Sequence, residues 1–168
     1  IRGRLHARGL PVPEAGVGPR VQGRLVHAVL RYFWEKVVTS SQLERMSDED
    51  VASVVESGIE SAMESEKVFE SRYGKRLLAI ERERVRGLVM QWLAYERTRM
   101  YPFEVTHREL RLGARINGFE FNVVIDRVDR VLTEDGDRNL LLDYKTSASV
   151  DTAGWNKGGM IEPQLPLY

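Results

Sequence analysis

The fold is decided by one stretch, GARINGFEFNVVIDRVDRVLTEDGDRNLLLDYKT at 113–146. Apolar and polar residues alternate along much of it, as in half-buried strands. Asn117-Gly118 is a strong signal for a two-residue hairpin turn, and a second turn is expected within 134–137. Before the first turn the strand pattern reaches back to Phe103. We therefore expect three antiparallel strands, over about 103–116, 119–132 and 139–146.

The chain before this sheet has a helical pattern, which Pro102 ends. Apolar residues recur at helical spacing in 21–38 and in 75–99. Ser47 followed by Asp-Glu-Asp is a typical helix start, so a second helix is expected from there to about Ser65. A short helix is expected over 66–73. The predicted class is α+β, with N-terminal helices packed on a three-stranded antiparallel core sheet.

The domain organisation follows from these patterns. Residues 1–20 contain prolines and glycines without a clear period and are interpreted as a lead-in or linker. The rest, 21–168, is expected to form one domain, helical over 21–100 and carrying the sheet over 101–168.

Composition excludes several classes of site. The 168 residues include no cysteine, so disulfides, iron–sulfur clusters and cysteine-bound zinc are ruled out. The net charge of zero supplies no argument for nucleic acid by itself. No apolar run reaches the length of a membrane span, so we expect no membrane association. A cytoplasmic location is expected, and the absence of cysteine is compatible with it.

The hairpin registers bring acidic residues together. A turn centred on Asn117-Gly118 places Glu109 opposite Asp126. A turn centred on Glu134-Asp135 places Asp126 opposite Asp143, whereas one centred on Asp135-Gly136 places Asp126 opposite Lys145. Because side chains alternate with period two, all four residues share one face in either register. A bulge at Gly113 would break this arrangement.

Crowded carboxylates raise each other's pKa unless a cation neutralises them. Oxygen ligands suit Mg²⁺ or Mn²⁺, so Asp126 and Asp143 are candidate metal ligands, with Lys145 as a candidate catalytic amine. The alternative is a structural salt bridge between Lys145 and one aspartate. Asp129 lies on the opposite strand face and is expected to pair with Arg127 or Arg130.

At this point the motifs resemble a known family. The segments IDRVD (125–129), LLDYKT (141–146) and QLPLY (164–168), with an upstream Gly23-x-x-x-His27, occur in the order found in the RecB-type branch of the PD-(D/E)XK nuclease superfamily. The nearest resemblance is to the nuclease domains of AddB-like recombination proteins. Four ordered motifs are far more specific than any one of them.

The resemblance implies a role for each matching residue. It implies a metal site formed by His27, Asp126 and Asp143, with Asp126, Asp143 and Lys145 as the catalytic residues. It implies DNA contacts by Gln164 and Tyr168. Glu109 matches an acidic position before the middle strand and is treated as a supporting residue.

Two departures accompany the resemblance. Val123 stands where the family usually has a small residue, three before the middle-strand aspartate. The restriction-endonuclease-like core also continues through a further helix and strand, so we expect this chain to be truncated before its last helix and strand. It is also expected to be the type without an iron–sulfur cluster.

These observations lead to three functional hypotheses. The first is a Mg²⁺- or Mn²⁺-dependent DNA exonuclease or endonuclease, acting in recombinational repair with a helicase or helicase-like partner. The second is a catalytically inactive nuclease-like module that binds DNA or acts as a scaffold, as Val123 and the truncated end suggest. The third, a carboxylate-pair hydrolase of another substrate, lacks an aromatic platform for a sugar beside the carboxylates.

Overall fold

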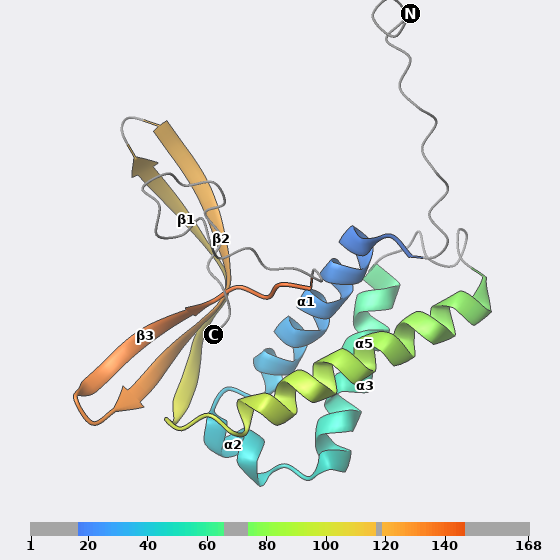
Figure 1. Ribbon diagram of the computed structural model, residues 1–168, viewed down its shortest axis with the longest axis horizontal. Helices are drawn as coiled ribbons and strands as arrows, with labels where there is room; N and C mark the ends of the chain where they lie inside the picture. Colours follow the sequence, from blue (N-terminus) through green and yellow to red (C-terminus); the bar gives the residue numbers. More distant parts are fainter. Residues whose placement is uncertain (1–16, 66–73, 117–118, 147–168) are drawn as a thin grey trace, which may run out of the picture.

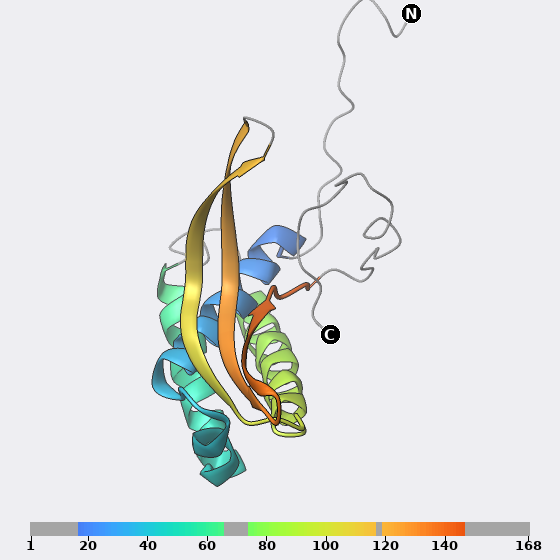
Figure 2. The ribbon, with the colours of Figure 1, turned by 90° about the vertical axis from the view of Figure 1, so that its left-hand side faces the viewer.

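The computed structural model describes residues 17–65, 74–116 and 119–146. Within these residues, four helices precede three strands, and the helices lie on one side of the sheet (Figures 1 and 2). The elements are α1 (Pro19–Lys36), α2 (Ser40–Arg45), α3 (Asp48–Ser65), α5 (Lys75–Glu96), β1 (Phe103–Ile116), β2 (Phe119–Thr133) and β3 (Gly136–Leu142). This arrangement confirms the predicted α+β class.

The helix boundaries are close to those predicted. Helix α1 begins at Pro19, two residues before the expected start, because proline suits the first turn of a helix. Helix α3 begins after Ser47, as predicted. The Ser47 hydroxyl accepts the Asp50 N–H at 3.1 Å, and the Asp50 carboxylate accepts the Ser47 N–H at 3.2 Å. The helix expected over 66–73 lies outside the described residues.

Helix α2 was not predicted. Its six residues are too few to produce a helical period, but its start is strongly encoded. Thr39 accepts the Gln42 N–H through its side chain, and the Gln42 side chain accepts the Thr39 N–H, which forms a capping box.

No helix in the described part of the chain is long and apolar enough to span a membrane.

The strands form one antiparallel sheet in the order β1-β2-β3. Ile116 pairs with Phe119, and the same register runs back to the pair of His107 with Val128. This is the register predicted from the Asn117-Gly118 turn, whose two residues lie outside the described part. The register shifts between Val105 and His107, so the irregularity is at Thr106 rather than at Gly113.

The second hairpin resolves the alternative left open by the sequence. Thr133 pairs with Gly136, so the turn is centred on Glu134-Asp135. Gly136 has φ +112°, a conformation that favours glycine. Strand β3 covers 136–142 rather than 139–146, and its last pair is Leu142 with Arg127. The prediction of strand structure through Thr146 was therefore wrong.

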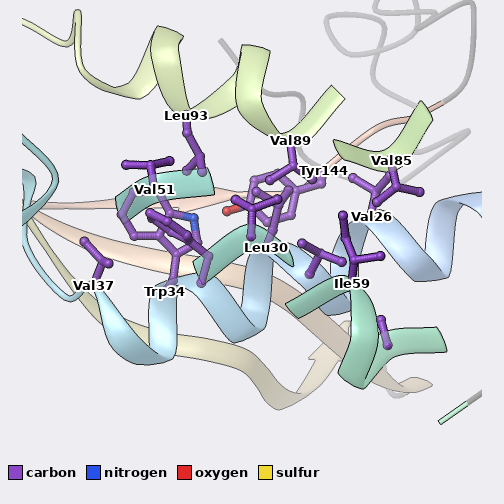
Figure 3. Close-up of a cluster of buried hydrophobic side chains, with 14 of the residues drawn as sticks. Val26, Leu30, Trp34, Val37, Val51, Ile59, Val85, Val89, Leu93 and Tyr144 are labelled. Atoms are coloured by element: carbon purple, nitrogen blue, oxygen red, sulfur yellow. The ribbon is translucent and has the colours of Figure 1, made fainter. Parts of the chain in front are cut away.

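The core lies between α1, α3, α5 and the helix-facing side of the sheet. Figure 3 shows its side chains meeting between the helices, with the ring of Tyr144 among them. Because Tyr144 is only 6% exposed, the segment that follows β3 is anchored in the core. The fully buried residues of α1 include Val29 and Phe33, each at 0% exposure.

Candidate active site

The candidate site forms where β3 separates from β2. The ladder between these strands stops at Arg127, so Asp126 has no strand partner on that side. Instead, the Asp126 carboxylate accepts the main-chain N–H of Tyr144 through Oδ2 at 2.7 Å. A hydrogen bond to a side chain thus takes the place of the next main-chain hydrogen bonds between the strands. This explains why β3 ends four residues before the predicted end at 146. The carboxylates of Asp126 and Asp143 are brought close together at this point.

His27 reaches this point from α1. Its Nδ1 lies 3.1 Å from Asp126 Oδ1, and its Nε2 lies 2.7 Å from the carbonyl oxygen of Tyr144. Since a carbonyl only accepts, Nε2 carries the hydrogen of that bond. The main chain of Tyr144 therefore fixes both side chains: its N–H holds Asp126 and its C=O holds His27.

The side chain of Tyr144 is itself held in place by its neighbours. Its ring packs edge-on against His27 and Trp92, at centroid separations of 5.8 and 5.9 Å. Its hydroxyl accepts a long hydrogen bond of 3.4 Å from the guanidinium of Arg127. Burial, partly opposed by the charge of Arg127, raises the pKa of Tyr144, so the hydroxyl stays neutral.

Asp143 and Lys145 flank Tyr144 in the sequence. Lys145 Nζ lies 2.8 Å from Asp143 Oδ2. This contact is a close ion pair to a buried oxygen of Asp143. The salt bridge that the sequence left as an alternative is therefore present, beside Asp126.

The two aspartates have opposite pKa shifts. Burial favours protonation of both, but the hydrogen bond and charge of His27 outweigh it at Asp126 and lower the pKa of that carboxyl. At Asp143, burial and the negative charge of Asp126 outweigh the ion pair with Lys145 and raise the pKa. Burial works to lower the pKa of His27, and the bond and charge of Asp126 reverse this and raise it.

Glu109 is near the site but does not join the carboxylate pair. Its place between the pairs Arg108–Arg127 and Leu110–Ile125 puts it level with Asp126, as predicted. It has φ +49°, unusual for a residue within a strand, so the regular alternation of side chains is broken there. Its carboxylate turns to Arg31 Nη1 at 2.8 Å, so the crowding of three carboxylates expected on one face does not occur.

Helix α1 and the segment after β3 approach closely at Gly23. A Cβ built at Gly23 would lie 3.0 Å from Thr146 Oγ1, which is tighter than ordinary packing. Glycine at this position lets α1 lie against the segment that carries Asp143 and Lys145. The Gly-x-x-x-His spacing thus has a local reason, because Gly23 and His27 occupy the same face of α1 one turn apart.

Two of the predicted site residues, Gln164 and Tyr168, lie outside the described residues.

The deep burial of Arg127 was not predicted from the sequence. Its pairing with Asp129 was one of the two expected options. Arg127 Nε and Nη2 donate hydrogen bonds to the Asp129 carboxylate at 2.6 Å each. A groove of about 840 Å³ between the end of α5 and β3 is lined by none of the predicted site residues that the structure describes.

The model of the PD-(D/E)XK nuclease superfamily matches residues 4–168. The chain belongs to this superfamily. No match was found among curated proteins or among solved structures. Membership of the PD-(D/E)XK superfamily points to nuclease activity.

PD-(D/E)XK nucleases typically use divalent cations, which take oxygen and nitrogen ligands of the kind present here. Asp143 Oδ2 is a buried carboxylate oxygen that is paired with Lys145, and Asp126 lies beside it. The 3.1 Å from His27 Nδ1 to Asp126 Oδ1 matches the roughly 3 Å between adjacent ligands of an octahedral shell at about 2.1 Å. The described part of the chain holds no preformed group of three such ligands, and Asp143 is ion-paired with Lys145. The donor set fits, provided that Asp143 turns from Lys145 toward the cation.

Proposed function

We propose that this chain is a metal-dependent deoxyribonuclease domain that hydrolyses phosphodiester bonds. The observation that carries the proposal is the convergence of His27, Asp126, Asp143 and Lys145 around the main chain of Tyr144. Membership of a nuclease superfamily supports the same reading. A buried carboxylate pair next to an imidazole and an amine has little value for stability alone, since each charge is costly to desolvate.

The residues have separate roles in this proposal. Asp126, Asp143 and His27 would hold Mg²⁺ or Mn²⁺, with Tyr144 orienting the first and third through its main chain. A divalent cation held there supplies Lewis acidity toward the scissile phosphate and toward the attacking water. Lys145 orients that water and offsets the negative charge that develops on the phosphate oxygens.

The order of the sequence motifs supports a finer assignment. We infer a RecB- or AddB-type exonuclease that acts in recombinational DNA repair with a helicase or helicase-like partner, in the cytoplasm. Gln164 and Tyr168 are proposed to contact the DNA. The carrying observation for the subtype is the succession of Gly23-x-x-x-His27, IDRVD, LLDYKT and QLPLY.

Cleavage of labelled DNA tests the main proposal. The 168-residue chain should degrade DNA with Mg²⁺ or Mn²⁺ and lose this activity with EDTA. Asp126→Asn and Lys145→Met should each lower kcat/KM by at least about 100-fold, because each removes charge that stabilises the transition state. The matched control is Arg130→Gln on β2, half exposed and ion-paired to Glu104, which should leave the rate unchanged. Undiminished cleavage by both site variants would show that another site does the chemistry.

One observation favours a second function. Lys145 neutralises Asp143 and His27 neutralises Asp126 without any metal, so the same residues also suit an inactive nuclease-like module that binds DNA or serves as a scaffold. Calorimetric titration with Mn²⁺ separates the two readings. Heat of binding that Asp126→Asn abolishes supports the nuclease, whereas DNA binding without any Mn²⁺ binding supports the inactive module.

A further inference from the structure

The site-facing side of α1 carries a row of cationic residues. Arg20, Arg24, His27 and Arg31 are spaced by four, three and four, which places them within an arc of about 60° on the helix. The row is about 16 Å long at about 1.5 Å per residue. His27 is the member that contacts Asp126, so two arginines precede the candidate site and one follows it.

This row lines a groove rather than a flat surface. The groove has a volume of about 600 Å³, and its lining residues are Arg20, Gly23, Arg24, His27, Ala28, Arg31 and Glu109. The described residues that line it thus include three guanidinium groups, one imidazole and one carboxylate. His27, Arg31 and Glu109 also line the cleft that contains Asp126, so the groove is continuous with the candidate site.

We propose that this groove binds the phosphodiester backbone of the DNA strand that enters the site. Arg20 and Arg24 bind phosphates on one side of the scissile bond, and Arg31 binds a phosphate on the other. The identity of the ligand rests on the proposed nuclease function. The length of the row suits several nucleotides, since one strand of B-form DNA rises about 3.4 Å per nucleotide. The planar fork of a guanidinium matches the oxygens of a phosphate.

Glu109 occupies one end of this groove in place of a phosphate. Its carboxylate pairs with Arg31 at 2.8 Å, and the two side chains are 42% and 45% exposed. Arg31 also lies 3.7 Å from Glu35 on its own helix. An arriving phosphate must therefore displace a carboxylate from Arg31. Glu109 acts as a competitor that weakens binding in the groove.

The salt dependence of DNA binding tests the proposal directly. Affinity for a labelled duplex is measured by fluorescence anisotropy at several salt concentrations, with EDTA present to prevent cleavage. Replacing Arg20, Arg24 and Arg31 together by Gln should lower the slope of log affinity against log salt by up to about 0.9 per arginine. Each single variant should weaken binding in the same direction. Arg86→Gln on α5, with a 47% exposed side chain near Glu83, is the matched control and should change nothing.

Glu109→Gln gives the opposite expectation. Removing the competing carboxylate should tighten DNA binding in EDTA, where no metal effect contributes. Unchanged affinity and slope in the triple variant, or weaker binding by Glu109→Gln, would overturn the proposal. Far-ultraviolet circular dichroism checks the fold of the triple variant, and the single variants carry the test if that variant unfolds.

A cleavage assay with Mg²⁺ distinguishes failure of the groove proposal from failure of the nuclease assignment. If the unsubstituted chain cleaves DNA while the triple variant binds normally, the groove proposal is wrong and the nuclease assignment stands. If the chain binds DNA with the expected loss of slope in the triple variant but never cleaves, the groove proposal stands and the nuclease assignment is wrong. Absence of any DNA binding overturns the groove proposal.

Discussion

Arg127 is the residue on which the packing beneath the candidate site depends. Its side chain is 1% exposed, with the guanidinium 3.8 Å from the ring centroid of Trp34. Glu96 and Asp129, both also buried, accept its hydrogen bonds. Burial works to lower the pKa of Arg127, but the neighbouring Tyr144, Glu96 and Asp129 outweigh it and raise the pKa. A buried ion cluster of this kind is tolerable only while every member has its partner.

The first prediction follows from that dependence. Arg127→Met should lower the free energy of unfolding by about 3–5 kcal/mol, because it leaves two buried carboxylates short of their main cation. Arg130→Met is the control on the same strand. Its side chain is 49% exposed, and its loss should cost less than about 1 kcal/mol. Urea denaturation measures both, and equal costs would contradict the role given to Arg127.

The second prediction separates the main chain of Tyr144 from its side chain. The hydrogen bonds to His27 and Asp126 come from main-chain atoms, so Tyr144→Phe should keep them. Only the 3.4 Å contact with Arg127 is lost, and stability should fall by at most about 1 kcal/mol. Cleavage should change by no more than a few-fold. A loss near 100-fold would mean that the hydroxyl itself acts in the site.

At the scale of elements, the hairpins show how far local sequence determines the sheet. The register of the first hairpin follows from its turn residues and was predicted. The turn residues of the second hairpin left two registers open, and the structure has the one centred on Glu134-Asp135. The early end of β3 was not predictable, because it depends on the contact between Asp126 and the Tyr144 N–H, which are 18 positions apart. The turned Glu109 likewise depends on its contact with Arg31 of α1, 78 positions away, which no local pattern encodes.

The third prediction uses two glycines within helices. A Cβ at Gly87 in α5 would meet nothing within 4 Å, so Gly87→Ala should stabilise the chain by about 0.5–1 kcal/mol. A Cβ at Gly58 in α3 would lie 3.2 Å from the Tyr32 ring on α1 and 3.3 Å from Val29. Gly58→Ala should therefore be less favourable than Gly87→Ala by about 1 kcal/mol or more. Thermal unfolding of both variants checks this, and the opposite ranking would contradict the close packing of α1 on α3.

At the scale of the whole molecule, the site joins three separate parts of the chain. His27 comes from α1, Asp126 from β2, and Asp143 with Lys145 from the segment after β3. The sequence predicted these residues because the hairpin registers align two of them and the family motif adds the others. It did not indicate that the main chain of Tyr144 would bond to both His27 and Asp126, or that Arg127 would be buried next to Tyr144. Both facts depend on how the helices pack on the sheet.

The fourth prediction concerns metal binding and stability. A cation that binds the folded chain alone stabilises it, by about 2.7 kcal/mol at a hundredfold excess over the dissociation constant. Mn²⁺ should therefore raise the Tm of the unsubstituted chain in a concentration-dependent way. Asp143→Asn should remove most of this rise, whereas Glu104→Gln at the exposed ion pair with Arg130 should preserve it. A rise of equal size in Asp143→Asn would place the metal elsewhere.

The position of the metal is the most direct test of the site. A crystal of the chain soaked in Mn²⁺ should show an anomalous peak about 2.2 Å from carboxylate oxygens of both Asp126 and Asp143. The His27 ring should lie at the same peak, and Asp143 Oδ2 should have turned from Lys145 to the metal. Absence of a peak there, with Lys145 still paired to Asp143 and His27 to Asp126, would contradict a metal-dependent nuclease site in this chain.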